Sequence, residues 1–240
     1  MLIKIKRGGG VITNVFMLLL LIIVVYKSQY YKKILQKLDL IEILPTDAPD
    51  YWALNGWTNT LQKIDYDADI AFFGNSITCM SDFQKSFPDK KVINLGYPGD
   101  TMKGMMLRMA MLRAVRPEKV FMMAGINGLK AMGVDQFAAE YETLVDSIQI
   151  SLPHSQLYLQ SILPVNANAY NRCGNNHKIQ SANNIISQIA VKKGCIYVDL
   201  FSLFYKDGML PQELTLDGVH LYPNAYHRWG NAIRKYVYEP

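Results

Sequence analysis

The chain has 240 residues, and half of them are hydrophobic. This length fits one α/β domain with an appendage. The net charge of +5 arises in residues 1–40, which hold seven Lys or Arg and one Asp, so the rest of the chain is close to neutral. This distribution argues against nucleic acid as a partner and favours a membrane surface.

The N-terminal segment is strongly apolar. Residues 11–26 read VITNVFMLLLLIIVVY, and counting from Gly8 brings the segment to about the length that crosses a bilayer. A cleaved signal peptide is the alternative, but the following YKSQYYKK lacks the small residues of a cleavage site. We therefore predict a single-pass signal anchor over residues 1–27. Its orientation stays open, because basic residues flank both ends in similar number.

Residues 28–67 are predicted to connect this anchor to a domain at 68–240. The run YYKKILQKLDLIEIL has roughly helical spacing, and the two prolines of PTDAPD end it. We expect Trp52 and Trp57 to pack against the edge of the domain.

From Asp69 onward, short β-rich runs alternate with stretches of helical periodicity, which predicts βαβ units and a parallel sheet. The runs are apolar nearly throughout, as in strands covered on both faces. We interpret the Met-rich helical stretch as core packing. The expected strands are DIAFF, KVINL, KVFMMA, LYLQSIL and CIYVDL, and the expected helices cover 101–115, 134–150, 175–193 and about 223–238.

Three cysteines are scattered along the chain and form neither a zinc motif nor a disulfide framework. We expect the three cysteines to act as small buried hydrophobic residues, and we expect no metal and no cofactor. They are Cys79, Cys173 and Cys195.

Polar motifs follow the predicted strands, at the edge where open parallel sheets bind ligands. They read GNSIT, GYPGDT and AGINGL, and LDGVHLYPNAY stands near the C-terminus. Each alone fits an ordinary turn. Together they supply a nucleophile in Ser76, a base in His220 and an acceptor for the base in Asp217. Backbone N–H groups of Ser76 and of the YPGDT turn, with the Asn127 amide, are candidate donors to an oxyanion.

These motifs resemble the four sequence blocks of the SGNH hydrolases, also called GDSL-type esterases and lipases. GNSIT, NLGYPGDT, GIN and DGVH match in order, and the resemblance covers about residues 68 to 238. It implies a flavodoxin-like three-layer α/β/α sandwich with about five parallel strands, here preceded by a membrane helix. In two places the sequence departs from the family pattern: Asn75 and Gly128 stand where the family often has Asp.

The resemblance also implies roles. Ser76 would attack an ester carbonyl and form an acyl-serine, His220 would carry the proton, and Asp217 would orient the imidazole. The N–H groups of Ser76 and Gly99 and the side-chain amide of Asn127 would form the oxyanion hole.

Further polar residues lie in the Asn-rich loop PVNANAYNRCGNN. Asn166, Asn168 and Arg172 are candidates for substrate contact, although Asn-rich turns are common without such a role. We expect His154 to be a surface residue, and His177 and His227 to have structural roles.

The sequence therefore predicts a membrane-anchored serine esterase that removes small acyl groups, such as acetyl, from a carbohydrate or small molecule. We expect its domain to lie outside the cytoplasm. Two alternatives remain open: an O-acyltransferase with the same catalytic residues, and a non-catalytic scaffold that binds a glycan or a partner.

Overall fold

The structure is a computed structural model that describes residues 66–129, 131–169 and 175–239. The predicted anchor and nearly all of the predicted connector, with both of its tryptophans, lie outside the described residues. Within the described ranges, no helix is both long and apolar enough to cross a membrane.

Five parallel strands form one sheet in the order β2-β1-β3-β4-β5. Strand β1 is an interior strand and every one of its residues is buried, as expected for a parallel strand with helices on both sides. The predicted parallel sheet of about five strands is confirmed. The strands are β1 (Ile70–Gly74), β2 (Val92–Gly96), β3 (Lys119–Met123), β4 (Gln156–Gln160) and β5 (Ile196–Val198).

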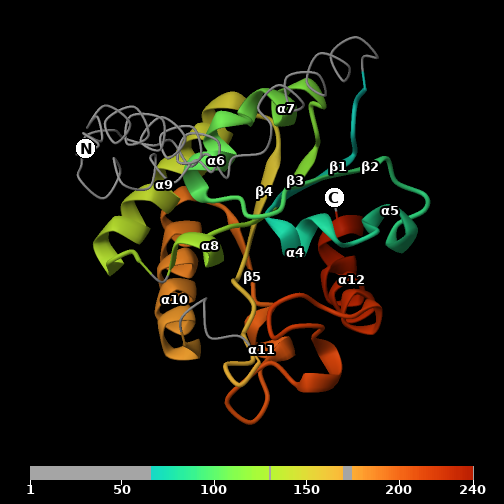
Figure 1. Cartoon of the computed structure of the whole chain (residues 1–240). Helices are drawn as coiled ribbons and strands as arrows, with labels where there is room; N and C mark the ends of the chain where they lie inside the picture. Colours follow the sequence, from blue (N-terminus) through green and yellow to red (C-terminus); the bar gives the residue numbers. More distant parts are fainter. Residues whose placement is uncertain (1–65, 130, 170–174, 240) are drawn as a thin grey trace, which may run out of the picture. The chain divides into compact units, whose positions relative to one another are not determined.

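Helices flank this sheet (Figure 1). Helix α9 contacts α6, α7 and α10, whereas α12 contacts α5. This arrangement confirms the predicted α/β class. The helices are α4 (Ser76–Cys79), α5 (Phe83–Ser86), α6 (Met102–Leu107), α7 (Met109–Ala114), α8 (Ile126–Leu129), α9 (Val134–Ser151), α10 (Asn176–Lys193), α11 (Phe201–Phe204), the 3-10 helix η1 (Gln212–Leu214) and α12 (Pro223–Tyr238).

The expected single helix over 101–115 is interrupted. Its two parts meet at Arg108, whose backbone leaves the helical region with φ −109° and ψ 20°. The side chain of this residue is buried at the end of the sheet, in contacts described below. The other predicted long helices agree with the structure to within one residue at each end.

An aromatic cluster joins the sheet to α5 and α12. Phe72 of β1 stacks on Phe83 of α5 with ring centroids 3.6 Å apart, and Trp229 of α12 meets Phe83 edge-on at 5.3 Å. Phe121 and Tyr158 continue the stack across β3 and β4 at 4.4 Å. Such pairs add to the stabilisation from burial, so α5 and α12 are firmly packed beside the C-terminal end of β1.

The prediction that the cysteines are buried was wrong for Cys79, which is exposed, and Cys195 is only half-buried. Cys79 ends the short helix α4, and its side chain faces solvent instead of the sheet. Cys173 lies outside the described residues. No group of His, Cys, Asp or Glu in the described ranges is arranged to hold a metal ion.

Candidate active site

Ser76 lies immediately beyond β1, and glycines make this position possible. A Cβ atom at Gly74 would lie 2.3 Å from Oγ1 of Thr78, and one at Gly96 would lie 2.2 Å from the backbone nitrogen of Cys79. Helix α4 therefore packs directly against the ends of β1 and β2, at distances that only glycine permits. The glycines at the ends of β1 and β2 thus allow the helix that begins with Ser76 to lie close to the sheet.

Three side chains fix helix α4. Asn75 caps its N-terminus, because its Oδ1 accepts a hydrogen bond from the N–H of Ile77 at 3.0 Å. From β2, Asn94 donates to the carbonyl of Thr78 at 2.9 Å. From α12, the hydroxyl of Tyr226 donates to the carbonyl of Ile77 at 2.8 Å. The predicted nucleophile is the first residue of this helix, so its position is set by three elements of the fold.

The structure brings the three predicted catalytic side chains together. Nε2 of His220 lies 2.9 Å from Oγ of Ser76, and Nδ1 of His220 lies 2.7 Å from Oδ2 of Asp217. The other carboxylate oxygen, Oδ1, accepts hydrogen bonds from the N–H groups of His220 at 2.8 Å and Val219 at 3.0 Å. A serine, an imidazole and a carboxylate thus form one hydrogen-bonded chain.

Asp217 is held as a carboxylate. Its partial burial favours the neutral form, but the hydrogen bonds from the His220 ring and from two backbone N–H groups outweigh this effect, and the pKa of Asp217 lies below its ordinary value. An ionised Asp217 accepts a hydrogen bond from the N–H at Nδ1 of His220. The lone pair of Nε2 then faces Ser76, as a general base requires.

The loop that carries Asp217 and His220 is fixed by Thr215, a buried residue that the sequence analysis missed. Its hydroxyl donates to the carbonyl of His220 at 2.8 Å and accepts from the N–H of Gly218 at 2.9 Å. Gly218 has φ +96°, a conformation that favours glycine. These contacts fix the positions of the Asp217 carboxylate and the His220 imidazole relative to each other.

Candidate oxyanion donors lie beside the serine. Ser76 is the first residue of α4, so its N–H has no acceptor within the helix. Gly99 is in a turn after β2 with φ +75°, and its N–H has no acceptor in the described part of the chain. The side-chain amide of Asn127 donates to the carbonyl of Asp100 at 2.7 Å, which leaves it a second N–H. This contact ties Asn127 to the turn that holds Gly99.

A buried ion pair underlies this region. Nε of Arg108 lies 2.6 Å from Oδ2 of Asp100, and the two side chains are 2% and 1% exposed. The other guanidinium nitrogens donate to the carbonyls of Leu95 at 2.6 Å and Gly74 at 2.8 Å. Arg108 therefore connects the ends of β1 and β2 to the turn at 99–100.

Burial shifts the pKa of both partners in this pair. It raises the pKa of Asp100 and lowers that of Arg108, and in each case the neighbouring opposite charge works against the shift. The sequence analysis missed this pair because it interpreted the Met-rich helix as core packing alone. The available signal was Arg108, a charged residue between methionines and leucines in the middle of that stretch.

The Asn-rich loop differs from expectation. Asn166 is buried, its amide donates to Gln212 at 3.2 Å, and its Oδ1 accepts from the N–H of Asn168 at 3.2 Å. The Asn166 side chain thus links its own loop to η1, and these contacts favour a structural role over the predicted substrate contact. Asn168 is exposed, and Arg172 lies outside the described residues.

Comparison with known proteins decides the family. The model of the GDSL-like lipase/acylhydrolase family matches residues 72–228. The chain belongs to this family. The match includes Ser76, Asn127, Asp217 and His220, and the hydrolase class predicted from the resemblance is confirmed. A comparison with curated protein sequences found no match.

Solved structures share the fold of this GDSL-like hydrolase. A Streptococcus pneumoniae protein, provisionally assigned as a platelet activating factor, is 24% identical with TM-score 0.69, and the alignment covers 77% of this chain and 92% of that one. A GDSL-like lipase from Bacteroides thetaiotaomicron is 21% identical with TM-score 0.64, covering 78% and 97%. A catalytic mutant of an acetylxylan esterase from Geobacillus stearothermophilus is 20% identical with TM-score 0.59, covering 73% and 96%.

Proposed function

We propose that this GDSL-like hydrolase is a serine esterase that cleaves small acyl esters, acetyl above all, from a carbohydrate. The observation that carries the proposal is the hydrogen-bonded chain from Ser76 through His220 to Asp217, with separations of 2.9 and 2.7 Å. Separations in this range allow a base to accept the proton of a nucleophile. The intact chain of three groups also argues against a purely non-catalytic scaffold.

In the first half of the reaction, Oγ of Ser76 attacks the carbonyl carbon and its proton passes to Nε2 of His220. Asp217 stabilises the imidazolium that results. The carbonyl oxygen gains negative charge and accepts hydrogen bonds from the N–H groups of Ser76 and Gly99 and from the Asn127 amide. The tetrahedral intermediate then collapses, the bond to the alcohol oxygen breaks, and His220 donates its proton to that oxygen.

In the second half, water takes the place of the alcohol. His220 removes a proton from the water as its oxygen attacks the acyl carbon, and the bond to Oγ breaks. The proton returns to Ser76, and the carboxylic acid leaves. If a sugar hydroxyl replaces the water, the same steps transfer the acyl group, so the acceptor alone separates an esterase from an O-acyltransferase.

The choice of acyl group and alcohol rests on similarity. The acetylxylan esterase from Geobacillus stearothermophilus shares this fold, which supports a carbohydrate ester as the substrate.

An ester series tests the proposed function. The purified full-length chain is assayed with p-nitrophenyl esters from acetate to octanoate and with acetylated xylo-oligosaccharides. We expect kcat/KM to be highest for acetate, and acetate to be released from the oligosaccharide in water. Release of p-nitrophenol that requires an added glycan hydroxyl, with the acetyl group recovered on that hydroxyl, would identify a transferase. No cleavage, together with no fluorophosphonate label on Ser76, would contradict the proposal.

Replacing Asn127 with alanine should lower kcat by about 100- to 1,000-fold with a smaller change in KM, because one oxyanion donor is lost. The assay is p-nitrophenyl acetate hydrolysis. Asn184→Ala is the matched control, since Asn184 is an exposed residue of α10. A kcat for Asn127→Ala within about two-fold of the wild type would show that Asn127 is not an oxyanion donor, because loss of such a donor lowers kcat far more.

A further inference from the structure

A groove of about 740 Å³ lies between α5, α12 and the loop that carries Asp217 and His220. The lining changes along its length. Part of it is apolar and includes Met80, Leu216 and Leu221, whereas another part is charged and includes Lys85 and Arg234. The proposed reaction leaves this groove without a role.

The groove is lined in part by chain neighbours of the catalytic residues. Two lining residues are chain neighbours of catalytic ones, since Leu216 precedes Asp217 and Leu221 follows His220. A third, Met80, is the C-cap of the helix that begins with the nucleophile. The apolar part of the groove therefore lies on the histidine side of the site.

The chemistry assigns this side to the alcohol. The carbonyl oxygen of a bound ester must point to the oxyanion donors, which come from the first residue of α4, the turn before α6 and the helix α8. The alcohol oxygen must lie near Nε2 of His220, because this nitrogen returns the proton to it. The alcohol half of the substrate is thus directed toward the loop of His220, and Leu216 and Leu221 of this loop line the groove.

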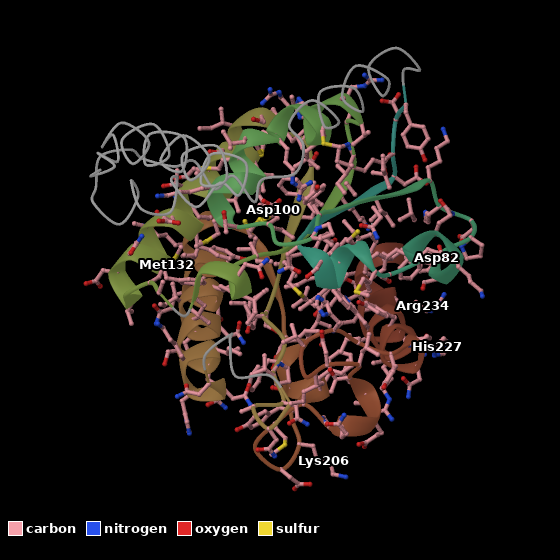
Figure 2. The ribbon with its side chains drawn as sticks, viewed as in Figure 1. Asp82, Asp100, Met132, Lys206, His227 and Arg234 are labelled. Carbon is pink, nitrogen blue, oxygen red and sulfur yellow. The ribbon has the colours of Figure 1, made fainter. Side chains whose placement is uncertain are left out.

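The charged part carries an excess of positive charge. Lys85 and Arg234 form no ion pair within the described ranges. The one carboxylate in the lining, Asp82, caps α5 by accepting from the N–H of Lys85 at 3.1 Å. Figure 2 shows Asp82, His227 and Arg234 on one side of the domain. His227 lines the groove as well.

Arg234 is held in place by neighbouring groups. Its guanidinium donates to the carbonyl of Ser86 at 3.3 Å and lies 5.6 Å from the ring centre of Phe87. The nearby carboxylate of Asp89 lies outside the lining, accepts a hydrogen bond from the hydroxyl of Tyr238 at 2.5 Å, and also attracts Arg234 electrostatically. The guanidinium retains further N–H groups for a ligand.

We infer that this groove binds the alcohol half of the substrate and selects alcohols that bear an anionic group, either a carboxylate or a phosphate. Lys85 and Arg234 pair with the anionic oxygens, and the apolar part packs against the body of the alcohol. The inference rests on the proposed esterase activity and names the class of ester within it.

Two substrate pairs that differ only in charge test the inference with the full-length chain. The first is acetylated oligogalacturonate against its methyl ester, and the second is acetylated glucose 6-phosphate against acetylated glucose. We expect kcat/KM to be about three- to ten-fold higher for the anionic member of one pair, as for a single partly screened charge contact. The pair that shows the preference identifies the anion as carboxylate or phosphate. The preference should shrink in high salt.

Variants connect this preference to the groove. Lys85→Gln and Arg234→Gln should each reduce it, while Arg234→Lys should retain part of it and p-nitrophenyl acetate hydrolysis should not change. Lys206→Gln removes the same charge at an exposed site apart from the groove (Figure 2) and should keep the full preference. A preference that survives in both Gln variants would overturn the inference.

The experiments distinguish an error in the inference about the groove from an error in the proposed esterase activity. Cleavage of p-nitrophenyl acetate with equal kcat/KM within both pairs overturns the groove and leaves the esterase standing. If no ester is cleaved, calorimetry with oligogalacturonate and glucose 6-phosphate on Ser76→Ala decides the groove alone. If Lys85→Gln is added to Ser76→Ala and binding weakens, the result supports the inference about the groove. Absence of binding to Ser76→Ala overturns that inference.

Discussion

Replacing Ser76 with alanine should abolish ester hydrolysis, with a fall in kcat of about 10⁵- to 10⁶-fold, as when the nucleophile of a serine hydrolase is removed. The hydroxyl is the atom that His220 contacts at 2.9 Å, and no acyl-enzyme can form without it. Residual turnover would come from substrate binding and the oxyanion donors alone. The measurement is p-nitrophenyl acetate hydrolysis, with fluorophosphonate labelling as a second readout.

The control for this loss is Ser181→Ala. Ser181 is exposed on α10 and its hydroxyl donates to the carbonyl of His177, so its replacement should leave kcat unchanged. Ser76→Ala should also unfold at the same urea concentration as the wild type, because a partly exposed hydroxyl is lost without a cavity. Hydrolysis by Ser76→Ala above about a tenth of the wild-type rate would exclude Ser76 as the nucleophile, since a lost nucleophile costs far more.

Replacing Arg108 with leucine should lower the free energy of unfolding by about 3–5 kcal/mol, the usual cost of breaking a buried ion pair. The change leaves Asp100 charged and buried. It also removes the donors of the strand-end carbonyls of Leu95 and Gly74. Both losses act on the ends of β1 and β2. The turn that holds Gly99 follows β2, so we also expect Gly99 to be less well positioned as an oxyanion donor and kcat to be lower. Urea denaturation measures the first effect.

An exposed ion pair of equal length provides the comparison. Nε of Arg116 lies 2.6 Å from Oδ1 of Asp67, but these side chains are 47% and 64% exposed. Solvent screens such a pair, so Arg116→Gln should cost less than about 1 kcal/mol. The double variant Arg108→Leu with Asp100→Leu should recover part of the lost stability, because no buried charge is then left unpaired. Equal costs for Arg108→Leu and Arg116→Gln would contradict the structural role of Arg108.

Periodicity predicted the elements of this fold well, because the spacing of apolar residues is a local property. The last helix, α12, begins at Pro223 and ends at Tyr238 as expected, since proline is well suited to a first helical turn. Periodicity failed to predict the interruption at Arg108, because that residue leaves the helical conformation while its side chain makes distant contacts. The predicted roles of the site residues remain predictions until the variants are assayed.

The sequence by itself determined the alternation of strands and helices and the family blocks, which place Ser76 and Asn127 after strands and Asp217 and His220 just before the last helix. These features follow from local spacing, and from the rule that the carboxyl ends of parallel strands share one edge. Only the tertiary structure decided that Asn166 is buried, that Arg108 joins two strand ends, and that a groove lined by Lys85 and Arg234 includes neighbours of His220. Each of these features depends on segments that are far apart in the chain. The same holds for the hydrogen bond between Ile77 and Tyr226, which are 149 residues apart. No local pattern encodes such distant contacts.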